Sequence, residues 1–566
     1  MGTQDPISSI QPGHGVDMER QPSNAVNNGN DELDESRLAQ FGYKQELDRD
    51  WGLAHNFGVS FSIISVITGL TTLFSYGLST GGPAVMSISW LVVSFFTLLV
   101  ATAMAEIVSA IPTSGGPYFW SAMLAPPSWS PFLAWLTGWF NLLGQVAVTT
   151  GITFGLAGLV STAITVKNPD YEQTPAKTIG IYAALLFSHG VVNTFGVKAL
   201  RWLNNVSIIL HSAGITALCI AVLVKAPKLQ SAKFVFGTYH DGTAAEPDGA
   251  EGWGQRASPA YVVLCGALMS QYTLTGFDAS AHLSEETKKA SWSAPIGVVS
   301  SVGFSSIFGF FVLMAFLFSI QDFEQVLDNR YGQPVLQIFV DVLGEDGALV
   351  LFGLIMVCVW HCGLFSMTSN SRMMFAFARD RGIPTLFTTI NPRFKSPLPA
   401  IYLATTLSFL LALPSLGSEV AFAAATSIAT IGLYLSYGLP IFIGLFWHKN
   451  FAAMKGPFNL GALSRPVAAA ACLWICFITV VFCLPTANPV TSQTLNYTVV
   501  AVGVITLGAV GSWMVWARRW FTGPEAREVA EAMRVGVDIT ELEPGALERR
   551  EKEKEVMEGR EKGVSE

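Results

Sequence analysis

The stretch "SQYTLTGFDASAHLSEETKKA", Ser270 to Ala290, decides how this chain folds. It begins like the end of a membrane helix and then places a glycine, an aspartate and a histidine within a few residues. A helix break inside hydrocarbon frees backbone N–H and C=O groups that lipid cannot satisfy. Such a break is tolerated where it lines a cavity, so the stretch predicts a ligand site in the middle of a membrane-spanning segment.

The composition supports a membrane protein. Of 566 residues, 51% are hydrophobic and 13% are charged, whereas a soluble domain carries about 25% charged residues. Apolar runs such as Leu203–Val224, Pro295–Ile320 and Tyr497–Trp516 are long enough to cross about 30 Å of hydrocarbon as helices. The charges gather in the two ends of the chain and in the connections. We therefore expect an all-α integral membrane protein.

About twelve spans are expected, and the polar ends flank them. Residues 1–50 are predicted to be a disordered cytosolic tail, 51–520 the twelve-helix domain, and 521–566 a charged cytosolic tail. Most Lys and Arg residues of the connections fall in those on the same side of the membrane as the N-terminus. This bias predicts that both termini lie in the cytosol. The seven Cys residues are scattered singly, so no disulfide framework is expected. The predicted limits of the spans are 57–78, 83–110, 132–161, 178–195, 203–225, 259–281, 295–320, 347–377, 398–415, 418–446, 467–486 and 496–517.

A second break is predicted in the first span, "SFSIISVITGLTTLFSYGLSTGG", where Thr68-Gly69 lies among hydroxyl groups. Thr275-Gly276 has the same setting in the sixth span, the corresponding place of a second five-helix half. Glycines also serve close helix packing in membranes. Glycine-interrupted helices at matching positions, however, indicate an inverted-repeat transporter with a site near the bilayer midplane.

The expected ligand follows from the ends of the half-helices. Their N-termini direct positive dipole ends at anions, and their C-termini offer carbonyl groups to cations. Two facing breaks therefore suit a small molecule with both a carboxylate and an ammonium group, such as an amino acid. No phosphate-binding G-x-x-x-x-G-K-[ST] loop is present, so ATP drive is not expected. We expect no enzymatic activity, no cofactor, no metal and no nucleic-acid partner.

Several motifs resemble one family in fixed order, over about residues 41–524. The chain resembles the amino acid–polyamine–organocation superfamily, closest to plant bidirectional amino acid transporters and the fungal GABA/choline permease branch. The resemblance implies a LeuT-type fold of two inverted five-helix repeats, with broken helices 1 and 6, plus two peripheral helices. It implies secondary active transport of amino acids or GABA-like zwitterions by alternating access, through proton coupling or exchange. The motifs are "PTSGGPYFWSAMLAPPSW" (Pro112–Trp129), "MSQYTLTGFDASAHLSEET" (Met269–Thr287), "SMTSNSRMMFAFARDRGIP" (Ser366–Pro384) and "SLGSEVAFAAATSIATIGLYLSYGLPI" (Ser415–Ile441).

The resemblance also implies a substrate site. In relatives, backbone N–H groups of the first break bind the carboxylate, carbonyl groups of the sixth span hold the ammonium, and the third span touches the substrate side chain. The first span here reads "ITGLTT" where bacterial members have "GSG". The implied positions are Ile67, Thr68, Gly69 and Leu70 in the first break, Tyr272, Thr273, Thr275, Gly276 and Asp278 in the second, and Asn141 and Gly144 on the third span.

Charged and titratable residues have other expected roles. Asp278 is an intramembrane acid, which either caps the second half-helix or contacts substrate or a proton. His211 falls where relatives often carry a basic residue in the second sodium site. A cation there removes the need for sodium, and histidine is the side chain best suited to titrate near physiological pH. The family further implies a cytosolic gate of Glu106, Glu285 and Arg372.

Alternatives remain open at this point. Choline or polyamines would call for an aromatic cage, for which Tyr272, Phe74, Phe140 and Trp139 are candidates. A sensor that binds an amino acid and signals through its tails is a second class, against which the short tails argue. The expected partners are thus a small-molecule substrate, a proton and the lipid bilayer. We expect the plasma membrane rather than an internal membrane.

Overall fold

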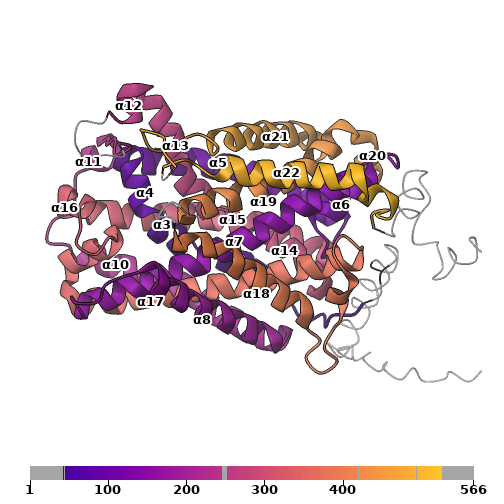
Figure 1. Cartoon of the computed structure of the whole chain (residues 1–566), viewed down its shortest axis with the longest axis horizontal. Helices are drawn as coiled ribbons and strands as arrows, with labels where there is room; N and C mark the ends of the chain where they lie inside the picture. Colours follow the sequence, from indigo (N-terminus) through magenta and orange to yellow (C-terminus); the bar gives the residue numbers. More distant parts are fainter. Residues whose placement is uncertain are drawn as a thin grey trace, which may run out of the picture.

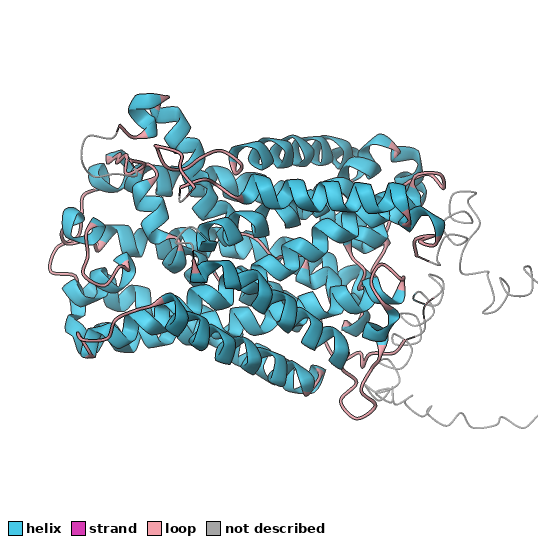
Figure 2. Ribbon diagram, in the orientation of Figure 1, coloured by secondary structure: helices cyan, strands magenta, loops and turns pink. Residues whose placement is uncertain are grey.

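The computed structural model describes residues 38, 43, 45–244, 251–417, 421–492 and 494–524. This part of the chain is a bundle of helices, and it contains only isolated β-bridges in place of strands (Figure 2). The predicted all-α class is therefore confirmed. The predictions for residues 1–37 and 525–566 lie outside the described residues.

Each of the twelve predicted spans is occupied by one helix or by two or three consecutive helices. Ten are long and apolar enough to cross a membrane by themselves; the fourth span is a 20-residue helix and the sixth is broken. The spans in chain order are α2 (Leu53–Ile64) with α3 (Val66–Thr72) and α4 (Phe74–Ser79), α5 (Gly82–Ala110), α7 (Ser130–Lys167), α8 (Pro175–Thr194), α9 (Val197–Ile209) with the π-helical η1 (Leu210–Gly214) and α10 (Ile215–Lys225), α13 (Pro259–Thr273) with α14 (Ala279–His282), α15 (Ala290–Phe318), α17 (Pro334–Arg379), α18 (Leu398–Ala412), α19 (Ala421–Phe446), α21 (Ser464–Val481) and α22 (Thr498–Val515).

Short helices lie at the two ends of the bundle. At the left end of Figure 1 are three of them, in the long outward connections. Two others lie toward the right end, where η2 also follows α14. The left-hand helices are α11 (Ala232–Gly237), α12 (Trp253–Arg256) and α16 (Phe323–Leu327), and the right-hand elements are α6 (Pro117–Leu124), α20 (His448–Ala453) and η2 (Ser284–Glu286).

The two halves of the bundle pack on each other span by span. In the contact pattern α3 and α4 meet α13, α5 meets α15, α7 meets α17, and α8 meets α18. Each of the first four spans thus contacts its counterpart in the second half, as two intertwined five-helix repeats require. The final helices, α21 and α22, pack on the outside of α5, α7 and α19, as expected for peripheral helices.

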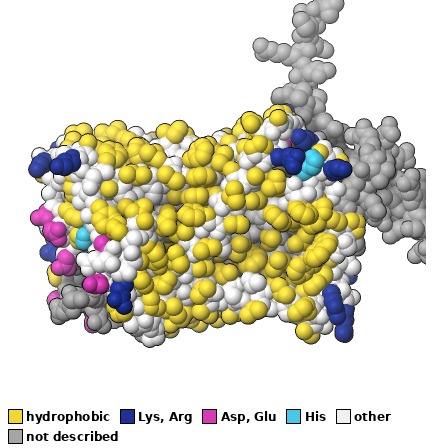
Figure 3. Space-filling model, turned by 90° about the horizontal axis from the view of Figure 1, so that it is seen from above, with side chains coloured by type: hydrophobic (Ala, Val, Ile, Leu, Met, Phe, Trp, Pro, Cys, Tyr) yellow, Lys and Arg dark blue, Asp and Glu magenta, His cyan; other side chains and the backbone are white. Residues whose placement is uncertain are grey.

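The surface has the pattern of a bilayer-spanning protein. Apolar side chains cover the middle of the face in Figure 3, and charged side chains gather at its two ends. Acidic side chains are visible only at the left end of this face, which carries α11, α12 and α16 in Figure 1. Lys and Arg side chains lie at both ends.

The N-terminal segment packs before the predicted domain boundary at residue 51. Tyr43 is 7% exposed and Leu47 is 3% exposed. The hydroxyl group of Tyr43 donates a hydrogen bond to Asp380 Oδ1 at 2.6 Å. Residues 43 and 45–50 therefore belong to the folded membrane domain, although the sequence predicts them to be part of a disordered tail.

Candidate functional site

The first helix break lies at Ser65, which adopts a left-handed conformation (φ 31°, ψ 73°). Its N–H group donates to the carbonyl of Phe61 and closes α2, while its own carbonyl accepts from the N–H of Thr68 at 2.7 Å. The sequence predicts the break at Ile67–Leu70, but these residues form the first turns of α3. The break comes one turn earlier because a serine, not the glycine, takes the left-handed conformation.

Gly69 has a different reason for being a glycine. A Cβ atom there would lie 2.2 Å from the Thr273 hydroxyl and 2.7 Å from the Thr273 Cα. The backbone of α3 thus touches the last residue of α13, and no side chain fits between them. The two broken helices meet at this contact.

The second break is where the sequence predicts it. Helix α13 ends at Thr273, Gly276 takes a positive φ of 92°, and α14 begins at Ala279. Glycine tolerates this conformation without the cost that a side chain adds. A Cβ on Gly276 would lie 2.5 Å from Ile63 Cγ2, so the second break also touches the end of α2.

Threonine and tyrosine side chains next to the two breaks are buried. Thr68 and Thr275 are 2% and 4% exposed, and Tyr272 is 6% exposed. In the first turn of α3, Val66 and Ile67 have backbone N–H groups without carbonyl partners within the helix. In the last turn of α13, the carbonyls of Gln271 and Tyr272 accept from Thr275, and each can accept one more hydrogen bond because a carbonyl oxygen has two lone pairs. The arrangement offers backbone donors at one break and backbone acceptors at the other.

Asp278 lies at the far side of the second break and is fully buried. Its Oδ2 atom accepts a hydrogen bond from Gln145 Nε2 at 2.8 Å and lies 3.2 Å from His282 Nε2. Oδ1 has no hydrogen-bond partner in the described chain. Tyr437 faces this carboxyl group from α19. Asp278 occupies the N-cap position of α14, but its side chain makes no cap hydrogen bond. Its roles as an N-terminal charge or as a contact for substrate or a proton both stay predictions.

The third span meets the breaks through other residues than those predicted. Asn141 donates from Nδ2 to the Ser436 hydroxyl at 3.0 Å, and a Cβ on Gly144 would lie 2.6 Å from the Leu433 backbone nitrogen. Both residues therefore face α19 in this conformation. Gln145 reaches Asp278, and a Cβ added at Gly151 would lie 3.0 Å from the Tyr272 hydroxyl oxygen. A substrate contact for Asn141 and Gly144 stays a prediction.

His211 joins the fifth span to the first break. Its Nε2 atom lies 2.8 Å from the Ser65 hydroxyl, and its Nδ1 atom lies 2.9 Å from the Ser207 carbonyl. The ring sits in η1, a π-helical turn of the kind that is frequent at functional sites. From the eighth span, the thiol of Cys362 donates to the Ile63 carbonyl at 3.1 Å. The first, fifth and eighth spans thus meet around Ser65.

The predicted gate residues Glu285 and Arg372 are both buried, but they do not pair with each other. Glu285 forms a two-pronged ion pair with Arg379 at 2.9 and 3.0 Å and accepts hydrogen bonds from the Ser114 N–H and hydroxyl groups. Burial raises the pKa of Glu285. Arg379 and Ser114 lower this pKa by more than burial raises it, so the pKa of Glu285 lies below its usual range. Arg372 instead pairs with Glu286 at 2.7 Å.

The N-terminal segment closes over these ion pairs. The Arg379 guanidinium lies 3.7 Å from the centre of the Tyr43 ring, in cation–π geometry. The next residue, Asp380, accepts hydrogen bonds from the Tyr43 and Tyr118 hydroxyls at 2.6 and 2.8 Å. Trp51 donates from Nε1 to Glu286 Oε2 at 3.0 Å. The end of the bundle that holds these ion pairs is therefore closed in this conformation.

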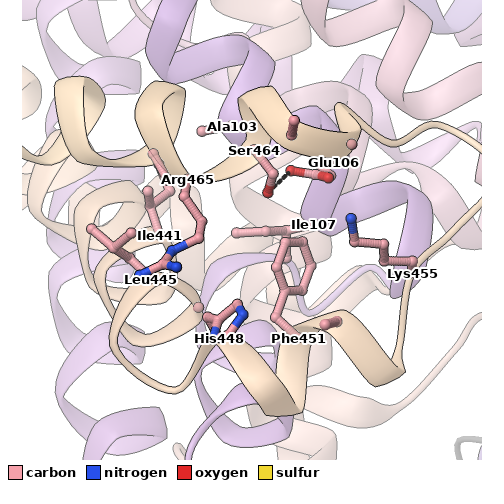
Figure 4. A pocket seen from close by; sticks show the side chains of 15 residues that line it. Ala103, Glu106, Ile107, Ile441, Leu445, His448, Phe451, Lys455, Ser464 and Arg465 are labelled. Carbon is pink, nitrogen blue, oxygen red and sulfur yellow. Dashed lines mark hydrogen bonds between the residues drawn. The ribbon is translucent and has the colours of Figure 1, made fainter.

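Glu106 lies apart from this gate cluster. Its two carboxylate oxygens accept hydrogen bonds from the Leu460 N–H at 3.1 Å and the Ser464 hydroxyl at 2.6 Å. Figure 4 shows Glu106 in the wall of a pocket between α5, α19, α20 and α21, with Lys455, His448 and Arg465 around it. Glu106 holds the connection before α21 in place, and its gate role stays a prediction.

Sequence reasoning missed four residues of the site: Ser65, His282, Gln145 and Arg379. Ser65 is one of many hydroxyl residues in its span, and Gln145 looks like an ordinary polar residue on α7. The signal for His282 was available, because it follows Asp278 by one helical turn. Arg379 lies in a stretch that also holds Arg381 and Arg393, and nothing in the sequence distinguishes it from them.

Comparison with known proteins agrees with this architecture. Residues 56–507 match the family described as "Amino acid permease". The chain belongs to the amino acid permease family. This permease is 42% identical over 512 residues to "Amino-acid permease BAT1 homolog" of Oryza sativa subsp. japonica, covering 88% of this chain and 96% of the relative.

Two further relatives widen the comparison. The permease is 40% identical to "Amino-acid permease BAT1" of Arabidopsis thaliana, covering 86% of this chain and 95% of the relative. It is 30% identical to "GABA-specific permease" of Saccharomyces cerevisiae, covering 89% and 88%. The family resemblance, the multi-pass membrane fold and the transporter class are confirmed.

Proposed function

We propose that this permease is a secondary transporter that moves amino acids or GABA-like zwitterions by alternating access. The observation that carries the proposal is the contact between the two helix breaks, at Gly69 against Thr273 and Gly276 against Ile63. Non-helical backbone at this depth is stable only where it is buried in protein or lines a cavity. A break in each half, meeting at one point, supports a single site that both halves control.

The ligand would lie between the first turn of α3 and the end of α13. The backbone N–H group of Ile67, in the first turn of α3, would bind the carboxylate, since the Thr68 N–H is already bonded to the Ser65 carbonyl. The carbonyl groups of Tyr272, Thr273 and Thr275 would accept from the ammonium. The two helix ends carry opposite partial charges, so a zwitterion is favoured in this orientation. The names of the rice, Arabidopsis and yeast relatives support amino acids, GABA included, as the substrate class.

The closed cytosolic end supports the alternating-access step. Opening toward the cytosol requires separation of Glu285 from Arg379 and of Glu286 from Arg372, two pairs between η2 and α17. Because η2 follows α14 directly, a movement of the second half-helix would open both pairs together. The substrate site would then open to the cytosol.

His211 is proposed to replace sodium. In its neutral form, Nδ1–H donates to the Ser207 carbonyl and Nε2 accepts from the Ser65 hydroxyl, so both nitrogens are satisfied without a charge. The ring then fixes the position of Ser65, which would be the role of a sodium ion between the same spans. Transport would therefore need no sodium.

The choline alternative lacks its aromatic cage in this conformation. Trp139 packs against Trp135 and Phe377, and Phe74 packs against Phe316. These rings belong to separate clusters, and Tyr272 lies beside Gly151. A zwitterion that uses backbone donors and acceptors is better supported than a quaternary amine.

Uptake by the purified full-length protein in liposomes tests the function. Labelled amino acids, GABA, choline and polyamines would be offered one at a time in sodium-free buffer. We expect uptake of one or more zwitterions, with competition by other free amino acids but not by their methyl esters, which lack the carboxylate. Equal competition by esters would overturn the proposed orientation, and uptake of choline alone would establish the amine permease.

Two results would separate the remaining alternatives. Binding of an amino acid without flux would favour the sensor over the transporter. Strict dependence of uptake on sodium would overturn the role of His211. With His211→Ala, we expect slower net uptake in sodium-free buffer, because Ser65 loses its partner across the spans.

A further inference from the structure

Asp278 and His282 form a buried pair. With Asp278 ionised and His282 neutral, the pair lacks one proton that its hydrogen-bond contacts require. His282 Nδ1 lies 2.9 Å from the Ser114 carbonyl, and Nε2 lies 3.2 Å from Asp278 Oδ2. A carbonyl oxygen can only accept, and an ionised carboxylate can only accept. Each ring nitrogen therefore faces an acceptor, but a neutral imidazole has one N–H to donate.

The pair satisfies these contacts by binding a proton. Either His282 is an imidazolium that donates from both nitrogens to an ionised Asp278, or Asp278 is a carboxylic acid beside a neutral ring. Both forms have a net charge of zero. Loss of the proton leaves a net charge of −1 on two side chains that are 0 to 1% exposed, which costs free energy in a medium of low dielectric constant.

His211 does not have this requirement. Its Nε2 atom faces a hydroxyl group, which can donate as well as accept. The hydroxyl chain from Ser65 to Thr68, at 2.6 Å, adapts to either protonation state. The hydrogen-bond arrangement therefore distinguishes His282 from His211. Of these two buried histidines, only His282 lies between two groups that can only accept.

Among the residues that the structure describes, the elements around the pair do not supply a fixed charge that would remove the need for the proton. Helix α7 contributes the neutral amide of Gln145, and α19 contributes the hydroxyl of Tyr437. Helices α2 and α15 pack against α14, and α15 has no Asp, Glu, Lys, Arg or His. On α2, His55 is half-buried at the cytosolic end, where Arg201 and Asp50 lie.

The cations on α17, which also packs against α14, have partners of their own. Arg372 is paired with Glu286 and Arg379 with Glu285. Neither guanidinium is therefore available to neutralise Asp278. The proton remains the positive charge that balances this carboxylate when no substrate is bound.

Hydrogen bonds connect this pair to the cytosolic gate. His282 binds the carbonyl of Ser114, whose N–H and hydroxyl groups both donate to Glu285 Oε1. Glu285 in turn holds Arg379. Asp278 itself ends the second helix break, next to the expected ammonium site. A change of charge at the pair therefore affects both the substrate site and the gate.

We propose that Asp278 and His282 together form the proton-binding site of this permease, and that one proton bound there is the coupling ion for amino acid transport. The site is loaded when it is open to the acidic side and is sealed in the conformation described above. When the gate opens, separation of Glu285 from Arg379 also releases Ser114. His282 then loses an acceptor, and the proton can leave to the cytosol. This coupling role rests on the proposed transport function.

The first test does not depend on transport. Infrared difference spectra of the purified full-length protein would be recorded between pH 5 and pH 9 without substrate. We expect a carboxyl or imidazole protonation change that is missing in both Asp278→Asn and His282→Gln. The control is His189→Gln, a fully buried histidine on α8 whose Nδ1 faces the Thr153 hydroxyl. Spectra of Asp278→Asn and His282→Gln that equal the wild-type spectra would overturn the proposal.

The second test measures coupling. Liposomes with an internal pH dye would receive the zwitterion that is taken up fastest in the panel above, and proton entry would be compared with substrate entry. We expect proton entry linked to substrate in wild type and His189→Gln, and loss of the linked signal per substrate molecule in Asp278→Asn and His282→Gln. Substrate uptake by wild type without proton entry would overturn the coupling and leave the transport function intact. Uptake of none of the zwitterions would instead refute the transport function, and the infrared test would still stand.

Discussion

At the scale of single residues, the site depends on positions where a side chain cannot be added. Gly276 needs its positive φ, whereas Gly69 is helical and needs the space that Thr273 occupies. The two glycines look alike in the sequence, since both follow a threonine. Their physical reasons differ, and so do the effects expected from substitution.

Gly69→Val is expected to abolish uptake. Its Cβ would lie 2.7 Å from the Thr273 Cα, so α3 and α13 must separate; an overpacked core typically loses about 1–3 kcal/mol of stability. The matched control is Gly158→Val on α7, where an added Cβ meets nothing within 4 Å. Uptake would be measured against the amount of folded protein at the membrane. Normal uptake by Gly69→Val would refute the close contact of the two breaks.

At the scale of elements, the cytosolic gate is made by η2 and by the end of α17, with the N-terminal segment laid across them. The buried pair Arg372–Glu286 has side chains that are 1% and 2% exposed. The pair Arg201–Asp50 lies near the same end, but its side chains are 42% and 23% exposed. The two pairs therefore allow a matched comparison of a buried with a partly exposed ion pair.

Arg372→Ala is expected to destabilise the protein by about 3–5 kcal/mol, because it leaves the Glu286 carboxylate buried and unpaired. Arg201→Ala is expected to cost less than about 1 kcal/mol, as is usual for exposed pairs. Thermal unfolding of the two variants in the same detergent would measure the difference. Equal loss in both variants would contradict the buried character of the gate. Arg372→Ala should also open the cytosolic end to labelling.

Asp380 gives the gate a dependence on pH. Burial raises the pKa of Asp380 to about 6 from its ordinary value of 3.8, and this effect exceeds the opposing effect of Arg379. A carboxyl group whose pKa is raised by packing stabilises the packed state when it is protonated. This stabilisation is complete at pH values below the pKa that the group has in the unfolded chain. That contribution is lost as pH rises through the folded value. The packing of Tyr43 on Asp380 is therefore expected to be tighter at pH 4 than at pH 7.

Asp380→Asn should remove this part of the pH dependence. The measurement is hydrogen exchange of the amides of residues 45–51, for wild type and variant, at several values between pH 4 and pH 7, after correction for the intrinsic exchange rate. The difference between the two proteins isolates Asp380, since Glu285 has a lowered pKa and acts in the opposite direction. A wild-type segment whose protection rises with pH, relative to the variant, would contradict the prediction.

At the scale of the whole molecule, the two ends of the bundle define its orientation. The end with α11, α12 and α16 carries the acidic side chains visible in Figure 3. The opposite end carries the closed gate and the connections with Lys198, Arg201, Arg381 and Arg393. This bias favours the gate end as the cytosolic end.

Single-cysteine labelling in cells would test the orientation. A cysteine at Asp170 or Asp328, both in connections at the end opposite the gate, is expected to react with an impermeant reagent added outside. A cysteine at Arg393 is expected to react only after permeabilisation. The reverse pattern would invert the topology, and with it the direction in which the gate opens. The same cells would show whether the protein reaches the plasma membrane.

The fold class, the twelve spans and the second helix break could be predicted from the sequence alone. Hydropathy is a local property, and the thickness of the bilayer fixes the length of an apolar run, so spans can be located without knowledge of their neighbours. Gly276 also acts locally, because its positive φ is a property of one residue. The motifs identified the family for the same reason, since they are contiguous.

Which side chains contact each other depends on how the helices pack, and this could not be predicted from the sequence. Glu285 pairs with Arg379, 94 residues away, whereas Arg372, the other predicted gate residue, pairs with Glu286. Gln145, not Asn141 or Gly144, is the residue of α7 that reaches Asp278. The face that a helix turns toward a partner depends on packing angles and on small residues at the crossing points. A rotation of one residue, about 100°, replaces one neighbour by another, and no periodicity in these uniformly apolar spans reveals it.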